Sequence, residues 1–118
     1  MFARFYPRKE MESAYAIPYG RYAQKGIRGV IFDIDNTLVM HGAPADERAR
    51  ELFCRLEGLG LKTCLLSNNK ERRVKPFADA VGSPYIFKAD KPSVKGYRKA
   101  MEAMGTDSRT TLFVGDQL

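Results

Sequence analysis

Short apolar runs alternate along this chain with longer segments whose apolar residues recur every three or four positions. The runs fall at 29–35, 62–67, 85–89 and 111–115, and they have the length of strands that are buried on both faces. Because strands that alternate with helices form parallel sheets with right-handed crossovers, we expect an α/β fold. Its architecture would be a three-layer, Rossmann-like sandwich with four strands present.

Proline and glycine mark the expected ends of the three helices between these runs. Pro44 is predicted to open the first helix, and Gly58 or Gly60 to close it. Pro76 is predicted to break or restart the second helix after one turn, because proline lacks the backbone N–H that a helix interior uses. Pro92 is predicted to begin the third helix, whose inner face we expect to comprise Val94, Tyr97, Met101 and Met104.

The composition is that of an ordinary globular domain. The 118 residues are 44% hydrophobic and 29% charged, which excludes collagen-like and wholly disordered chains. No apolar run approaches the ~20 residues of a membrane-spanning helix, and the N-terminal MFARFYPRKEMES lacks the apolar stretch of a secretory signal. Without such a signal, Cys54 and Cys64 are predicted to be small buried residues in a reducing compartment. We therefore expect a cytoplasmic domain.

The positive charge is concentrated at the start of the chain. The whole chain has a net charge of +6, and residues 1–28 hold six basic and two acidic residues together with six of the thirteen aromatic residues. This division predicts a basic, aromatic arm over 1–28 and a core domain over 29–118. The arm could be a solvated surface, could pack on the body, or could bind RNA or an anionic bilayer at the inner membrane face. No obligate protein partner is evident from the sequence.

Polar residues follow each of the four apolar runs. They are Asp33 and Asp35 after the first, Ser67 and Asn68 after the second, Lys91 after the third and Asp116 after the fourth. Because ligands of open parallel sheets bind at the carboxyl ends of the strands, we expect these side chains to converge on one small site.

The residue types at these strand ends suit a metal and a phosphate. Clustered carboxylates repel one another unless a cation lies among them, and hard oxygen ligands of this kind suit Mg²⁺. A hydroxyl and an ammonium group suit a phosphate instead. Metal and phosphate together indicate phosphoryl transfer, in which one Asp can act as nucleophile and another as general acid and base.

The same residues carry a family resemblance. VIFDIDNTLV resembles the first motif of the haloacid dehalogenase (HAD) superfamily of aspartyl-phosphate phosphatases, and LLSNN, KP and LFVGDQ resemble its second, third and fourth motifs in order. More narrowly, DIDNTLV, SNNKERRVKPFA, FKADKP and VGDQL resemble the YqeG-type branch of subfamily IIIA. That branch is related to the eukaryotic phosphatidylglycerophosphate phosphatases.

The resemblance implies a role for each of these polar residues. Asp33 would be the nucleophile and Asp35 the general acid and base. Ser67, with Asn68, would hold the transferring phosphoryl group, and Lys91 would neutralise it. Asp33, Asp116 and the backbone carbonyl of Asp35 would bind Mg²⁺, and Thr37 would brace the loop that follows the first strand.

The resemblance also bears on the limits of the domain and on its substrate. The family's fourth motif continues to a further Asp, a helix and a strand, so we expect the core to be incomplete at Leu118. The connection after the first motif, at 36–43, leaves no room for a cap domain. An uncapped site would be open to a bulky phosphomonoester: a lipid phosphate, a nucleic-acid end or a phosphoprotein. The eukaryotic relatives of the branch point to phosphatidylglycerophosphate.

Two other classes of function remain as alternatives. A receiver-type domain also gathers carboxylates, a hydroxyl and a lysine, but its phosphorylated Asp follows the third strand, whereas DIDNT here follows the first. A non-catalytic or fragmentary HAD-like binding module could use the basic arm to contact RNA or a membrane. Two local alternatives also remain: Lys88 competes with Lys91, and Ser67 could be no more than a helix N-cap.

Overall fold

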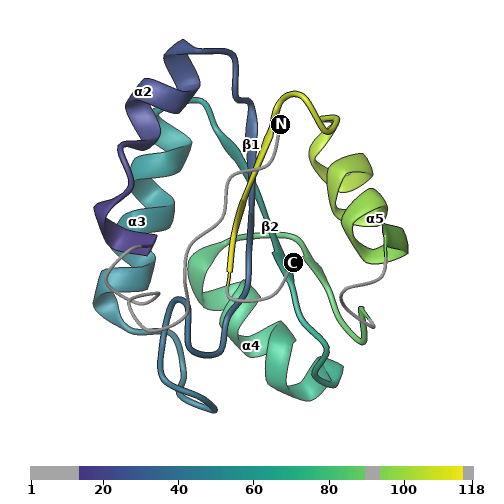
Figure 1. Cartoon of the computed structure of the whole chain (residues 1–118). Coiled ribbons are helices and arrows are strands. Elements are labelled where there is room, and N and C mark those ends of the chain that lie inside the picture. Colours follow the sequence, from purple (N-terminus) through teal and green to yellow (C-terminus); the bar gives the residue numbers. More distant parts are fainter. Residues whose placement is uncertain (1–13, 90–93, 116–118) are drawn as a thin grey trace.

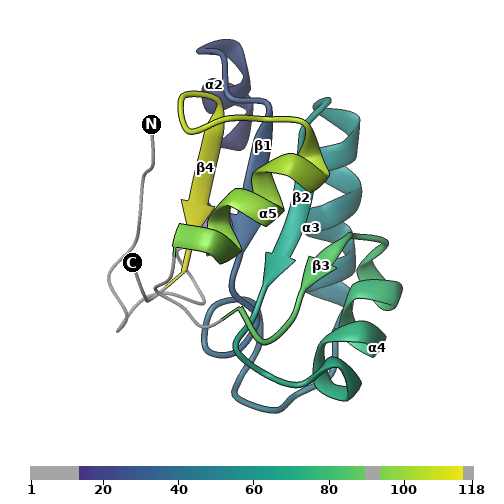
Figure 2. The ribbon, with the colours of Figure 1, turned by 90° about the vertical axis from the view of Figure 1, so that its right-hand side faces the viewer.

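The computed structural model describes residues 14–89 and 94–115, which form a four-stranded sheet with helices on both faces. The strands are β1 (Gly29–Phe32), β2 (Lys62–Leu66), β3 (Tyr85–Ile86) and β4 (Thr111–Val114). Their order across the sheet is β3-β2-β1-β4, and every pair is parallel; Figure 1 shows the sheet nearly edge on, and Figure 2 labels all four strands. The predicted α/β sandwich with a parallel sheet is therefore confirmed.

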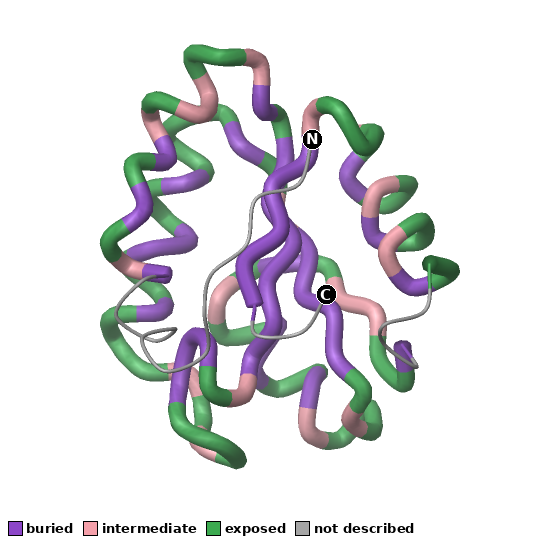
Figure 3. The backbone as a smooth tube through the Cα atoms, viewed as in Figure 1, coloured by how far each residue is buried: buried purple, intermediate pink, exposed green. Residues whose placement is uncertain are grey.

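Helices cover both faces of this sheet, as the nearly edge-on view in Figure 1 shows. The helices are α2 (Tyr19–Gln24), α3 (Glu47–Gly58), α4 (Glu71–Val81) and α5 (Val94–Met104). Buried residues of α2, α3 and α4 share one hydrophobic cluster with β1, whereas α5 packs on the other face against Ile31, Cys64 and Phe113. Every residue of β1 and β4 is buried, so the core lies along these strands (Figure 3).

Aromatic rings join the first face of the sheet to its helices. The ring of Phe32 lies 5.1 Å from that of Phe53 on α3 and 6.1 Å from that of Tyr19 on α2, measured between centroids. Such tilted pairs add stabilisation of about 1 kcal/mol each to the burial of the rings. Phe32, the residue directly before Asp33, therefore packs against both helices.

The first two long helices differ in part from the sequence predictions. α3 begins at Glu47, after Asp46, whose side chain accepts a hydrogen bond from the amide of Ala49. An Asp cap therefore sets the start of this helix, rather than Pro44. α4 runs unbroken through Pro76, because the burial of Val74, Phe77 and Ala78 along one face outweighs one lost backbone hydrogen bond.

The third long helix and the cysteines also correct two predictions. Val94 is 67% exposed, and the buried residues of α5 are Gly96, Ala100 and Met104, with Tyr97 and Met101 partly buried. Cys54 is exposed, because the buried face of α3 runs through Ala49, Leu52, Phe53 and Leu56 and leaves Cys54 outside it. The predicted burial of Cys64 is confirmed.

The hydrophobic core extends across residue 28 into the predicted arm. Ala14, Ile17, Tyr19 and Ile27 are buried in the same cluster as β1. The hydroxyl of Tyr15 donates to the carbonyl of Leu38 at 2.9 Å, which ties this segment to the loop after β1. The prediction that the arm packs on the body therefore holds for residues 14–28. Residues 1–13 of the arm lie outside the described residues.

No helix in the described parts of the chain is both long enough and apolar enough to span a bilayer.

The two thiols should differ in reactivity. Cys54 is exposed, whereas Cys64 has no exposed surface and burial raises its pKa to about 12. Because the thiolate is the reactive form, a disulfide-exchange reagent at pH 8 should modify one thiol per native chain and two after denaturation. The Cys54→Ser variant should show no rapid native reaction. Two rapid equivalents in the native protein would contradict the packing of β2.

Candidate active site

The register of the sheet brings three strand ends to one edge. Phe32 pairs with Leu65 on one side and with Val114 on the other, so Asp33, Ser67 and Gly115 leave the sheet close together. The amide of Asp33 donates to the carbonyl of Val114 at 3.0 Å, which extends the pairing by one residue. Asp33 is only 3% exposed. The structure therefore buries a carboxylate directly at the end of the central strand.

Gly115 forms one wall around this carboxylate. A Cβ atom on Gly115 would overlap Oδ2 of Asp33, lie 2.7 Å from its Cγ and lie 2.7 Å from Cζ of Phe113. Real Cβ atoms do not approach other atoms so closely, so the position requires glycine for steric reasons rather than for backbone freedom. The backbone that leads to residue 116 thus starts in contact with the Asp33 side chain.

A tight turn after Asp33 positions the second carboxylate. Asn36 has a φ of 62°, in the left-handed region that Asn tolerates better than most residues. Its amide donates to the carbonyl of Val39 at 2.7 Å, and the amide of Leu38 donates to the carbonyl of Ile34 at 3.0 Å. Because Ile34 and Leu38 are buried, the turn is fixed to the core while Asp35 stays at the rim.

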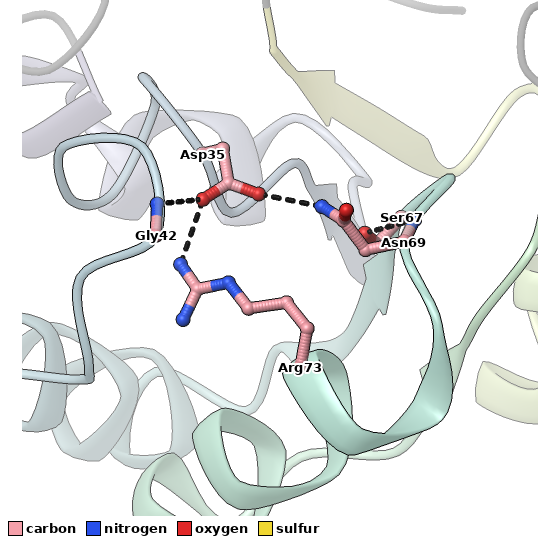
Figure 4. Close-up of polar contacts among 5 residues, drawn as sticks. All are labelled: Asp35, Gly42, Ser67, Asn69 and Arg73. Carbon is pink, nitrogen blue, oxygen red and sulfur yellow. Dashed lines mark hydrogen bonds and ion pairs between the residues drawn. The ribbon is translucent and has the colours of Figure 1, made fainter.

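Asp35 is the centre of a polar network (Figure 4). Its Oδ1 accepts from Nη2 of Arg73 at 2.7 Å and from the amide of Gly42 at 2.8 Å, and its Oδ2 accepts from Nδ2 of Asn69 at 2.8 Å. Burial by itself raises the pKa of Asp35, but the hydrogen bonds from Arg73 and Gly42 and the charges of Arg73 and His41 lower it below its usual value. In this arrangement Asp35 is held as a carboxylate.

Ser67 and Asn69 form the loop after β2. Ser67 is 4% exposed, and its Oγ accepts from the amide of Asn69 at 3.0 Å. α4 begins only at Glu71 after Lys70, so this bond closes a turn and does not cap the helix. A hydroxyl that accepts one bond can still donate its own proton. Asn68 is exposed beside it.

The loop after β3 lies against the loop after β2. The amide of Lys88 donates to the carbonyl of Asn69 at 3.0 Å, and the amide of Ala89 donates to the carbonyl of Ser67 at 2.9 Å. Lys88 itself is exposed. Lys91 follows two residues after Ala89, but it lies outside the described residues, as does Asp116.

The oxygen donors among the described residues can be compared with the needs of a metal ion. Among residues 14–89 and 94–115, no three His, Cys, Asp or Glu side chains form a cluster that could hold an ion. The carboxylate of Asp33 and the backbone carbonyl of Asp35 are nevertheless hard oxygen donors of the kind that Mg²⁺ takes. The hydroxyl of Thr37 is also buried, and it finds no hydrogen-bond partner within the described residues. The two oxygen donors fit Mg²⁺, and the proposed third ligand is the side chain of Asp116.

The family resemblance implies that Thr37 braces the loop after β1. Its backbone amide does so, since it donates to the carbonyl of Ile34 at 3.3 Å.

Sequence reasoning missed the residues that hold Asp35. Asn69 and Arg73 were visible only as members of a polar run, SNNKERR, and the Gly42 amide carries no side-chain signal at all. The available signal was position: Arg73 lies in the first turn of the helix that follows a strand end in the site. Its side chain is 20% exposed, so it is not an ordinary surface arginine.

Comparison with known families assigns the class of this site. The profile of the haloacid dehalogenase-like hydrolases matches residues 40–118, which is more than half of the chain. The chain therefore belongs to the haloacid dehalogenase-like hydrolases.

Within that family the chain falls among the phosphatases. It is similar to "Probable phosphatase YqeG" of Bacillus subtilis, with 36% identity over 97% of this chain and 67% of that protein. This match also spans the segment of Asp33 and Asp35, which precedes the part of the chain matched by the family profile.

Solved structures show the same fold. The cobalt-bound deoxy-D-mannose-octulosonate 8-phosphate phosphatase of Haemophilus influenzae has a TM-score of 0.63 and 15% identity, over 79% of this chain and 60% of that one. A hypothetical protein of Xanthomonas campestris has a TM-score of 0.65 and 14% identity, over 97% of this chain and 65% of that one. This chain thus spans less than two thirds of either structure.

The close approach at Gly115 gives a direct test of the site's geometry. The Gly115→Ala variant should displace the Asp33 carboxylate, and an error of about 1 Å in a reacting group lowers turnover on the order of 100-fold. Gly58→Ala is the matched control, because nothing lies within 4 Å of the Cβ it would add. Hydrolysis of p-nitrophenyl phosphate measures both. Equal turnover by the two variants would contradict the described contact.

Proposed function

We propose that the chain hydrolyses phosphomonoesters through an aspartyl-phosphate formed on Asp33. The observation that carries this proposal is the burial of Asp33 at the end of the central strand, beside the turn that holds Asp35 and the loop that holds Ser67. A buried carboxylate at that place has a fixed direction and little competing water. The class of the family supports the same reaction.

The roles proposed for the residues follow the chemistry of the groups. A carboxylate oxygen of Asp33 attacks phosphorus, and the bond from phosphorus to the ester oxygen breaks. Asp35, a carboxylate in the free protein, takes up a proton from solvent when the substrate binds and gives it to the departing oxygen, so the alcohol leaves neutral. Water then attacks phosphorus, Asp35 takes its proton, and inorganic phosphate leaves Asp33 as a free carboxylate. Ser67 and Asn68 orient the phosphoryl oxygens, and Lys91 balances their charge.

We propose Mg²⁺ as the metal of this site. When bound, it would neutralise charge on the transferring phosphoryl group and on Asp33. Asp33, the backbone carbonyl of Asp35 and the side chain of Asp116 would hold it.

The proposed substrate is a lipid phosphate such as phosphatidylglycerophosphate. The resemblance to the YqeG-type branch supports it, and so does an apolar hollow near the turn that carries Asp35. That hollow has a volume of about 490 Å³ and is bordered by Leu38, Val39 and Met40, of which Met40 is 68% exposed. Apolar surface beside the site suits a substrate that stays in a bilayer. We place the protein in the cytoplasm, attached at the inner membrane face through its basic N-terminal residues.

The second candidate is a non-catalytic HAD-like module that binds RNA or a membrane. The charge of residues 1–28 favours it, because Lys and Arg beside aromatic rings suit both partners. It differs from the enzyme in one respect that can be measured, since its binding does not require Asp33.

Substitution of the nucleophile tests the enzyme directly. Asp33→Asn should abolish Mg²⁺-dependent hydrolysis of p-nitrophenyl phosphate, because it removes the attacking oxygen while keeping the shape of the side chain. Asp79→Asn is the control, since that carboxylate lies on the surface of α4, paired with Lys75. Mass spectrometry of acid-quenched wild-type protein should place the phosphoryl adduct on Asp33. Wild-type turnover by Asp33→Asn, or an adduct on another residue, would contradict the proposal.

Neutralising three basic residues tests the membrane proposal without removing residues of the hydrophobic core. Replacing Arg4, Arg8 and Lys9 with Gln should weaken binding to anionic vesicles roughly 100-fold, at about 1 kcal/mol per charge. The control replaces the exposed Arg98, Lys99 and Arg109 with Gln, which makes the same change in net charge elsewhere. Co-sedimentation over a salt series measures both. Equal loss of vesicle binding in the two variants would indicate an effect of net charge alone. It would contradict specific binding of the membrane by the arm.

A further inference from the structure

A groove leads away from Asp35 along one face of α4. It has a volume of about 330 Å³ and is lined by Gly42 and Pro44 on one side and by Arg72, Arg73, Pro76 and Phe77 on the other. Two of these residues, Gly42 and Arg73, are also the ones that donate hydrogen bonds to Oδ1 of Asp35. Two lining residues of the groove therefore contact the Asp35 carboxylate, although Asp35 does not itself line the groove. The volume is at the lower end of the range for small-molecule sites.

The groove has a basic mouth and apolar walls. Arg72 and Arg73 lie in the first turn of α4, whereas Pro76, Phe77 and Ala80 continue along the same helix face. At 1.5 Å per residue, Arg73 and Ala80 are about 10 Å apart along the helix axis. An occupant would place a negative charge near Asp35 and less polar atoms farther out.

Arg73 has more hydrogen-bonding capacity than the described network uses. Its Nη2 donates to Asp35 at 2.7 Å, but its Nε is buried and lacks a hydrogen-bond partner within the described residues. Its guanidinium also lies 5.8 Å from the ring of Phe77, which holds it at the groove. A guanidinium group is a fork that matches a planar or tetrahedral oxyanion with two donors, and one carboxylate oxygen does not satisfy it.

Any leaving group that reaches Asp35 comes close to Arg73. The proposed proton transfer needs the ester oxygen within hydrogen-bond distance of Asp35, and Arg73 lies 2.7 Å from Oδ1 of that residue. Substituents one or two carbons from the ester oxygen would then face the guanidinium group. A negative substituent would compete with Asp35 for Arg73, whereas a neutral one would not.

We propose that Arg73 is a specificity-determining residue that exchanges Asp35 for a second anionic group on the leaving side of the substrate. The inference rests on the proposed function, because it takes Asp35 to be the residue that meets the leaving oxygen. It assigns the substrate to phosphomonoesters that carry a further carboxylate or phosphate close to the ester oxygen. It also gives the ion pair a function: Asp35 holds the guanidinium in place until the substrate anion arrives.

Binding to the Asp33→Asn protein tests this without any need for turnover. Calorimetry with Mg²⁺ present would compare 3-phosphoglycerate with glycerol 3-phosphate, which differ in a terminal carboxylate. A second pair, ethane-1,2-diol bisphosphate and 2-hydroxyethyl phosphate, makes the same comparison for a phosphate two carbons away. In at least one pair the compound with the extra anion should bind about 10- to 100-fold more tightly, the range of one hydrogen bond to a charged group. The pair that shows the preference identifies the anion.

Variants of Arg73, combined with Asp33→Asn, decide whether that residue is responsible. Arg73→Gln should reduce the ratio of the two affinities to about one, and Arg73→Lys should keep part of it because the charge remains. Arg98→Gln is the matched control, since Arg98 is an exposed arginine on α5, which contributes no residue to the groove. Asp35→Asn should increase the ratio, because it removes the carboxylate that competes for Arg73. A purely structural Arg73 would not produce that increase.

The outcomes separate this inference from the proposed function. Equal affinities within both pairs, or a preference that survives in Arg73→Gln while Arg73→Lys and Arg98→Gln stay folded, would overturn the role of Arg73. Loss of the nucleophile's role, seen as full turnover by Asp33→Asn alone, would refute the mechanism but leave the affinity ratio to be explained. Tighter binding of the anionic partner that depends on Arg73 supports the inference in either case.

Discussion

The central strand, β1, is buried on both faces and hydrogen-bonded along both edges, and the rest of the molecule depends on that position. A strand in that position needs residues without polar side chains, and the four residues of β1 meet this need. The next residue in the chain is therefore the first that can be polar. That residue is Asp33, and its amide still belongs to the sheet while its side chain leaves it. The location of the site thus follows from where the sheet ends.

Burying Asp33 creates an electrostatic problem that the surrounding residues reduce. Asp33 and Asp35 are separated by one residue, and neighbouring carboxylates repel one another. Arg73, the amide of Gly42 and the side chain of Asn69 offset the charge of Asp35. The carboxylate at the rim is therefore stabilised by the protein itself, and the buried one is part of the proposed cation site. This division of labour agrees with different roles for the two acids.

Much of the fold was predictable because its signals are local, and the rest depends on contacts that are distant in sequence. The apolar runs gave all four strands of the described sheet, although β3 ends at Ile86, three residues before the predicted Ala89. The strand ends likewise gave Asp33, Asp35 and Ser67, which the structure brings to one edge. The predicted break of the helix at Pro76 was wrong, because the effect of a proline on a helix depends on how much apolar surface the helix buries. Arg73 was missed because a partner 38 residues away gives it its place.

The position of β1 between β2 and β4 also has a consequence for the order in which the molecule assembles. Gly29 pairs with Lys62 on one side and with Thr111 on the other, so one edge of the central strand is satisfied early in synthesis and the other much later. Until β4 leaves the ribosome, the nascent chain presents an unpaired apolar edge of the kind that promotes aggregation. Asp33 also acquires its backbone partner at Val114 and its wall at Gly115 only then. Asp33, the proposed nucleophile, is therefore synthesised early, but Val114 and Gly115 enclose it only late.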